Sequence, residues 1–199
     1  KIIVELKRKK LVSDQLLIAT GRIPNTDILD VKKGNIEINE KGFIKTNEFL
    51  ETTSQNVWAL GDIAGKYLFK HSANLESQYV FDNVVLDKKL KVDYSAMPHA
   101  IFSSPQIAGV GLREQDLKDN YVIGRYEYIN TGMGTAMQEK TGFVKIFADK
   151  NTRRILGCHI MGSQASTLIH EVILAMKANL PIDAIQNTIH IHPALSEVI

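Results

Sequence analysis

The strongest constraint on the fold lies in residues 142–179. Two apolar runs, GFVKIFAD and RILGCHIMG, flank the polar loop KNTR, a pattern typical of an antiparallel β-hairpin. The following segment, residues 163–179, has the periodicity of an amphipathic helix. Its apolar face comprises Leu168, Ile169, Val172, Ile173 and Met176. A hairpin followed by a helix that must bury one face predicts a self-contained α+β unit.

The first half of the chain predicts shorter elements. Two β-like runs surround the basic cluster KRKK, which we interpret as the solvated turn of a hairpin, with an anion-binding patch as the alternative. The second run ends in QLLIAT, which predicts a buried strand that stops at GRIPN. Residues 27–53 predict small antiparallel strands and turns. VWAL, Val57 to Leu60, predicts another buried strand, ended by Gly61.

Helices and a boundary complete this outline. The run SANLESQYVFDNVVL predicts a helix with Ser72 as its N-cap. The charged patch that follows predicts a domain boundary near Lys91. Pro181 predicts the start of a second short helix in the last part of the chain. The stretch NTGMGTAM, around Met133 and Met137, predicts a loop and not a cofactor-binding motif.

Composition excludes several classes of function. The 199 residues are 44% hydrophobic and 23% charged with a formal net charge of +2, typical of a soluble globular protein. Such a small charge argues against nucleic acid as a partner. No apolar run approaches the roughly 18 residues of a membrane span, so we expect no membrane partner. The single cysteine allows no internal disulfide, which fits a reducing cytoplasm.

The stretch HIHPALSE contains the best candidate for acid-base chemistry. A residue before proline is pushed out of the helical region, while proline suits the first turn of a helix. His192 should therefore lie in an extended segment just before a helix that contains Glu197. From there the Glu197 carboxylate can fix the tautomer of the His192 ring, so that the other ring nitrogen accepts a proton. Alternatively, Glu197 only caps its helix and His192 is an ordinary surface histidine.

Three other features have competing interpretations. His190 and His192 lie two residues apart and could share a metal ion, but no cluster of other ligands joins them, so we predict no metal site. Asp62 follows a predicted strand and Gly61, where α/β folds bind ligands, or it only begins a turn. Cys158 lies within a strand pattern without a CxxC partner, which favours a buried core thiol over a reactive one.

In combination these motifs resemble a known family. The chain is similar over its whole length to the C-terminal half of the pyridine nucleotide-disulfide oxidoreductases. This flavoprotein family includes dihydrolipoamide dehydrogenase, glutathione reductase, mycothione reductase and mercuric reductase. The motifs that carry the resemblance are ATGRIPN (19–25), ALGDIAG (59–65), KHSANLES (70–77), GFVKI (142–146), LGCHIMG (156–162) and HPALSE (192–197).

The resemblance implies a domain order. Residues 1–23 would be the end of the NAD(P)-binding domain, and residues 24–91 the returning part of an FAD-binding α/β domain. Residues 92–199 would be an α+β dimerisation domain with a mainly antiparallel sheet. The family's two GxGxxG fingerprints and its redox CxxxxC pair are absent from the chain, so we expect residue 1 to be a truncated start and this chain alone to be inactive.

The resemblance also implies roles for single residues. Gly21 matches the glycine near the nicotinamide nucleotide, and Asp62 the aspartate that hydrogen-bonds FAD. Lys70 matches the position where, in the family, a backbone amide at the start of a helix contacts the flavin. The family has small residues at this position and Lys70 is long, so the resemblance implies only the backbone contact for Lys70. His192 and Glu197 match the catalytic base and its orienting carboxylate, which act across the interface of a homodimer.

The implied function is therefore FAD-dependent, NAD(P)-linked dithiol/disulfide oxidation and reduction. Dihydrolipoamide dehydrogenase is the most similar member, with a small disulfide substrate such as the lipoyl group of a partner protein. KHSANLES and IHPALSE are also similar to mycothione reductase. Glutathione-type and mercuric reductases remain alternatives, as does a non-catalytic dimerisation module formed by this chain alone.

Overall fold

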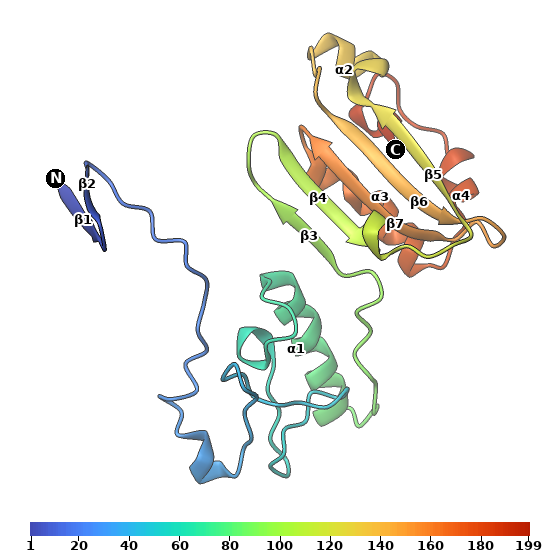
Figure 1. Cartoon of the computed structure of the whole chain (residues 1–199). Coiled ribbons are helices and arrows are strands. Elements are labelled where there is room, and N and C mark those ends of the chain that lie inside the picture. Colours follow the sequence, from blue (N-terminus) through green and yellow to red (C-terminus); the bar gives the residue numbers. More distant parts are fainter. The chain divides into compact units, whose positions relative to one another are not determined.

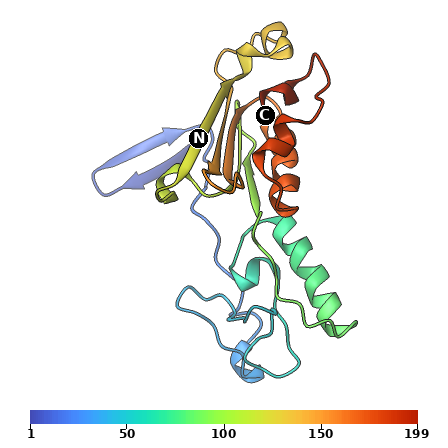
Figure 2. The ribbon, with the colours of Figure 1, turned by 90° about the vertical axis from the view of Figure 1, so that its right-hand side faces the viewer.

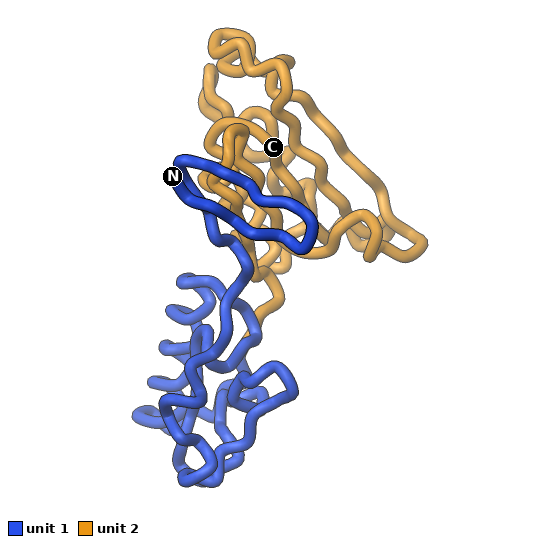
Figure 3. Tube along the Cα trace, turned by 60° about the vertical axis from the view of Figure 1, so that its left-hand side comes forward, with its two compact units in different colours: residues 1–92 blue, residues 93–199 orange.

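The computed structural model describes residues 1–199, which form two compact units. Unit 1 comprises Lys1–Val92 and unit 2 comprises Asp93–Ile199 (Figure 3). The division falls within the charged stretch that follows the first long helix of the chain.

Unit 1 begins with the predicted hairpin. Strands β1 (Ile2–Leu6) and β2 (Lys9–Ser13) pair antiparallel, with Leu6 opposite Lys9, so Lys7 and Arg8 form the turn. The basic cluster KRKK thus spans the turn and the start of β2. An ion pair of 2.5 Å between Lys10 and Glu5 on the neighbouring strand offsets part of its charge.

The predicted strand in QLLIAT is wrong for this chain. Residues 14–25 have no regular secondary structure, and Leu17 and Ile18 are 88% and 74% exposed. The segment has the apolar composition of a strand, but no other part of the chain pairs with it. A β-strand needs a neighbouring strand for its ladder of backbone hydrogen bonds, so composition alone does not produce one.

The predicted strand at Val57–Leu60 is also wrong. Trp58 forms only a single bridge with Glu51, and a second isolated bridge joins Ile38 and Ile44 where small antiparallel strands were predicted. Two 3₁₀ helices, η1 (Val31–Gly34) and η2 (Gly61–Ala64), flank this region. The small core comprises Val31, Ile44 and Ala59. It is held by turns more than by a sheet.

Helix α1 (Lys70–Val84) confirms the predicted helix but corrects its start. Phe69 is the N-cap residue, and Ser72 is a fully buried helical residue whose Oγ donates to the Phe69 carbonyl at 2.7 Å. The prediction that Ser72 caps the helix is wrong because its hydroxyl bonds back to a carbonyl within the first turn. The buried Glu76 accepts a hydrogen bond from the Gly61 amide at 2.5 Å, which joins α1 to η2.

Unit 2 is built on one five-stranded antiparallel sheet (Figure 1). Its order is β3-β4-β7-β6-β5. The strands are β3 (Pro98–Ile101), β4 (Gln106–Gly111), β5 (Tyr121–Glu127), β6 (Phe143–Asp149) and β7 (Ile155–Gly162). The predicted β6–β7 hairpin is confirmed, with Phe143 opposite Met161. The predicted α+β class with a mainly antiparallel sheet is confirmed.

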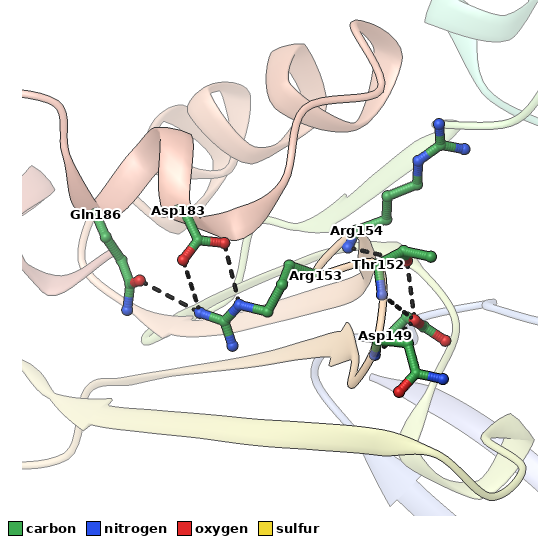
Figure 4. A network of polar contacts seen from close by, with 7 residues as sticks. Asp149, Thr152, Arg153, Arg154, Asp183 and Gln186 are labelled. Atoms are coloured by element: carbon green, nitrogen blue, oxygen red, sulfur yellow. Dashed lines mark hydrogen bonds and ion pairs between the residues drawn. The ribbon is translucent and has the colours of Figure 1, made fainter.

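Helix α3 (Ala165–Lys177) lies against one face of this sheet (Figure 2). Its buried residues are Ala165, Ile169, Val172 and Ala175, which pack on apolar residues of β4 and β7. The predicted second helix is α4 (Ile182–Gln186), which Pro181 precedes as N-cap residue. Arg153, in the β6–β7 loop, donates two hydrogen bonds to the Asp183 carboxylate of α4, at 3.0 and 3.1 Å (Figure 4).

The predicted loop at NTGMGTAM is wrong. It contains the short helix α2 (Gly132–Ala136), whose N-cap Thr131 accepts from the Gly134 amide at 3.0 Å through its hydroxyl. Two 3₁₀ turns, η3 (Glu114–Asp116) and η4 (Tyr128–Asn130), lie before it. The last element is a third such turn in unit 2, η5 (Leu195–Val198). Glu197 therefore lies in a 3₁₀ turn that begins two residues after Pro193, later than predicted.

Candidate functional site

His192 and Glu197 form a hydrogen-bonded pair. The Nδ1 atom of His192 lies 2.8 Å from Oε1 of Glu197. Because a carboxylate only accepts, this contact places the proton on Nδ1 and leaves Nε2 with a free lone pair. The His192 side chain is 71% exposed while that of Glu197 is 24% exposed. The geometry thus presents an oriented imidazole whose free nitrogen can exchange a proton with a group outside unit 2.

The second oxygen of Glu197 is also used. Oε2 accepts from the Ala194 amide at 2.9 Å, at the N-cap of η5. Both contacts lower the pKa of the Glu197 carboxyl below its ordinary 4.5, and the Ala194 amide has the larger effect. The same carboxylate therefore caps its helical turn and orients His192, so the two interpretations drawn from the sequence are not exclusive.

Gly132, at the start of α2, makes a close approach to the His192 ring. A Cβ built on Gly132 would lie 2.9 Å from Cε1 of His192 and 3.6 Å from its Nε2. It would also lie 3.5 Å from Pro193. The absence of a side chain at Gly132 therefore leaves the space that the imidazole edge occupies.

His190 makes its own contacts and does not join His192 in a metal site. Its Nε2 lies 2.9 Å from Glu171 Oε1, and its Nδ1 lies 3.1 Å from the Thr188 carbonyl. No group of three or more His, Cys, Asp or Glu residues in residues 1–199 is arranged to hold a metal ion. His190 instead connects the last segment of the chain to helix α3.

In unit 1, Asp62 lies within η2 and is about half exposed. Arg22 donates to its Oδ2 at 2.6 Å and to the Leu68 carbonyl at 2.8 Å. Gly21, the preceding residue, has a φ of +96°, a conformation that favours glycine, and nothing lies within 4 Å of its would-be Cβ. Arg22 thus links the segment of Gly21 to both Asp62 and the approach to α1.

Lys70 is the first residue of α1. No side chain caps this 15-residue helix at Phe69, and the N-terminus of a helix favours an acceptor or a negative charge. The Lys70 ammonium itself pairs with Asn74 one turn later. These features fit a backbone contact with a flavin ring, and the Asp62 carboxylate fits a sugar hydroxyl.

Cys158 lies in β7 and is fully buried. Burial raises the pKa of its thiol to about 12. A thiol of this kind stays protonated at neutral pH and cannot act as a nucleophile or redox group. The prediction of a buried core cysteine is confirmed.

Three residues of these sites were missed from the sequence. Arg22 stands within the motif ATGRIPN, and its charge beside Gly21 was the available signal. Gly132 and Glu171 carry no local signal, because their importance comes from side chains that are distant in sequence. Only the folded unit brings them to His192 and His190.

Unit 2 is thus an α+β domain with a five-stranded antiparallel sheet, a covering helix and a terminal His192–Glu197 pair. Residues 97–199 match the family description "Pyridine nucleotide-disulphide oxidoreductase, dimerisation domain". Residues 1–86 match "Pyridine nucleotide-disulphide oxidoreductase". The chain belongs to the pyridine nucleotide-disulphide oxidoreductase family, which confirms the resemblance drawn from the motifs.

Individual relatives agree with this assignment. Dihydrolipoyl dehydrogenase 3 of Haloarcula marismortui is 35% identical over 193 residues, covering 96% of this chain and 40% of that protein. Mycothione reductase of Mycobacterium tuberculosis is 37% identical over 196 residues, covering 94% of this chain and 42% of that protein. The chain spans about two fifths of the length of the curated relatives it matches.

A solved structure shows the same fold. The HOCl-induced flavoprotein disulfide reductase RclA from Escherichia coli superposes with a TM-score of 0.89 at 28% identity, covering 98% of this chain and 46% of that one. The chain is thus part of a family of oxidoreductases that use flavin and pyridine nucleotide. None of its helices has the length and apolar character needed to cross a membrane.

Proposed function

We propose that the chain is the C-terminal portion of an FAD-dependent, NAD(P)-linked dithiol/disulfide oxidoreductase, with dihydrolipoyl dehydrogenase as the first candidate activity. Residues 1–23 end the NAD(P) domain, residues 24–91 complete the FAD domain, and residues 92–199 form the dimerisation domain. The observation that carries the proposal is the 2.8 Å contact between His192 and Glu197, within a chain of this family.

On this proposal His192 is the acid-base group. Its Nε2 accepts the proton of a substrate thiol, whose ordinary pKa near 8.5 leaves little thiolate at neutral pH. The thiolate is the form that attacks a disulfide. Glu197 stabilises the imidazolium that results and keeps the ring from rotating. The exposure of His192 supports action on a disulfide held by the other subunit of a homodimer.

The cofactor contacts are assigned to unit 1. Asp62 would hold the FAD ribityl or ribose hydroxyls, and the amides at Lys70 would face the pyrimidine edge of the flavin. Bound FAD supplies electron transfer between pyridine nucleotide and disulfide. Gly21 leaves room for the nicotinamide nucleotide, because its backbone conformation and missing side chain allow close approach. Arg22 holds the Asp62 carboxylate in place.

The acid-base role is tested by His192→Gln in the complete, FAD-loaded protein. General acid-base groups contribute about 100-fold or more, so the rate of dithiol oxidation should fall by about that factor. His170→Gln is the matched control, because His170 is an exposed histidine of α3 in the same unit. A His192→Gln variant within twofold of wild type would exclude the assignment.

A mycothione reductase activity is the second candidate. The 37% identity to the Mycobacterium tuberculosis enzyme supports it as well as the 35% identity to dihydrolipoyl dehydrogenase supports the first. Steady-state kinetics with dihydrolipoamide and with mycothiol disulfide separates the two. The substrate with at least tenfold higher kcat/KM identifies the activity.

A non-catalytic dimerisation role for this chain alone is supported by the match of residues 97–199 to the dimerisation domain. Sedimentation of the 199-residue chain should then show a dimer. Its visible spectrum should show little flavin, because no GxGxxG fingerprint lies within these residues. A monomeric or fully yellow preparation would contradict this role.

A further inference from the structure

The segment that carries His192 has few contacts of its own. After α4 the chain runs through residues 187–193 without regular secondary structure, and no backbone–backbone hydrogen bond involves residues 189–193. Ile189 and Ile191 are 96% and 79% exposed, so apolar packing does not fix the segment either. Yet this is the segment that carries His192.

The contacts of His190 contrast with this exposure. Its side chain is 22% exposed, and both ring nitrogens have partners. Nε2 faces the Glu171 carboxylate at 2.9 Å and Nδ1 faces the Thr188 carbonyl at 3.1 Å. Both partner atoms are hydrogen-bond acceptors, so the ring is held from two sides, by a carboxylate of α3 and by the local backbone.

Glu171 lies on a helix that is packed firmly against the sheet of unit 2. It lies in the middle of α3, between Ile169 and Val172, which are buried against the sheet. Helix α3 packs on β3, β4 and β7. A bond to Glu171 therefore connects the segment to the core of unit 2, two residues before His192.

We infer that the His190–Glu171 pair is a positioning device that holds the segment 188–193 so that His192 keeps its contacts with Glu197 and Gly132. This inference rests on the proposed acid-base role of His192. His190 and Glu171 touch no reacting group and act only through His192. A displacement of about 1 Å at a reacting group can lower the rate by up to about 100-fold. Loss of the His190–Glu171 contact should therefore lower the rate measurably.

The kinetic test uses Glu171→Ala in the complete, FAD-loaded protein. We expect kcat to fall about tenfold with the KM for substrate unchanged within twofold. Glu171→Gln keeps an acceptor oxygen and should recover most of the loss. Glu114→Ala is the matched control, since Glu114 also forms an ion pair of unit 2, with Lys145, and should leave kcat unchanged.

The decisive comparison repeats Glu171→Ala in the His192→Gln background. If Glu171 acts through His192, the second change adds no further loss, because the group it positions is already gone. An equal fall in kcat in both backgrounds, or no fall in either, would overturn the inference. A His192→Gln variant that is fully active would instead overturn the proposed function.

A measurement that does not depend on catalytic activity distinguishes the anchoring role from the proposed function. The Ala194 amide is bonded to Glu197 Oε2, so its hydrogen exchange reports on the site next to His192. Glu171→Ala should speed this exchange about tenfold, and Glu114→Ala should not. Unchanged exchange at Ala194 in Glu171→Ala would contradict the anchoring role, whatever the kinetics show.

Discussion

At the scale of the residue, the orientation of His192 depends on an empty space as well as on a hydrogen bond. Glu197 holds the ring through Nδ1, while Gly132 leaves room for the adjoining atom Cε1. The hydrogen bond sets the orientation of the ring, and the missing side chain at Gly132 lets the ring take that orientation.

Gly132→Ala tests this space. The new Cβ would lie 2.9 Å from Cε1 of His192, a separation that side chains do not tolerate, so the ring must shift. The backbone of Gly132 is helical and accepts alanine, so stability should not fall. We expect kcat to drop about tenfold at unchanged melting temperature. Gly34→Ala, where the nearest atom is 3.5 Å away, is the control. Full activity in Gly132→Ala would show that the ring adapts freely.

The lowered pKa of Glu197 predicts that the stability of the folded protein depends on pH. Its folded-state pKa is lowered below 4.5 by the Ala194 amide and His192, so the carboxylate stabilises the folded state above that pH. This contribution is lost as the pH falls through the folded pKa. Glu197→Gln should therefore destabilise the protein at neutral pH, and the difference should vanish in acid. Urea unfolding of both proteins across this range measures it; a difference that is constant with pH would contradict the prediction.

The sequence predicts part of this site. The spacing of His192, Pro193 and Glu197 places a carboxylate near an imidazole because both lie within one local segment, and the contact is present. Gly132, Glu171 and Arg22 could not be assigned in the same way. Their roles depend on which distant segments the folded units bring together, and periodicity contains no such information.

At the scale of the element, Tyr128 packs where η4, β6 and β7 meet, just before α2. This residue is fully buried, and a Cβ on Gly142 or Gly162 would lie 2.7 or 2.8 Å from its ring. Its hydroxyl donates to the Ser163 carbonyl at 3.1 Å, and burial raises the pKa of the phenol well above 10. The ring thus joins the start of η4 to the ends of β6 and β7, next to α2.

Substitutions at Tyr128 should separate packing from hydrogen bonding. Tyr128→Phe loses one bond and leaves the Ser163 carbonyl without that donor, which costs about 1 kcal/mol. Tyr128→Ala leaves a cavity between two glycines that cannot fill it, which costs about 3–5 kcal/mol. Denaturant unfolding measures both. Equal losses in the two variants would mean that the hydroxyl, not the ring, holds this end of the sheet.

Elements were predictable where the signal was local. The β6–β7 hairpin and α3 follow from periodicity and a polar turn, and both are present. QLLIAT and VWAL have strand composition, but strands need partners, and this chain supplies none for the first and only one bridge for the second. Helix α2 was missed because two of its five residues are glycines, which disfavour a helix, although Thr131 was a usable N-cap signal.

At the scale of the whole molecule, the proposed function divides each active site between two chains. His192 is exposed on unit 2, and the chain's single cysteine is a buried thiol that cannot exchange with a disulfide. These 199 residues contain His192 but no disulfide, and the proposed reaction uses one. On the proposed function this is the disulfide of the other subunit, so each active site of the dimer takes His192 from one subunit and the disulfide from its partner.

Mixing two inactive proteins tests this arrangement. One complete protein carries His192→Gln, and the other carries serine in place of a cysteine of its redox disulfide. Unfolding and refolding an equal mixture gives half heterodimers, each with one site that combines an intact His192 with an intact disulfide. Activity should then return to about a quarter of wild type. If His192 served its own subunit, every site in the heterodimer would lack one of the two groups and no activity would return.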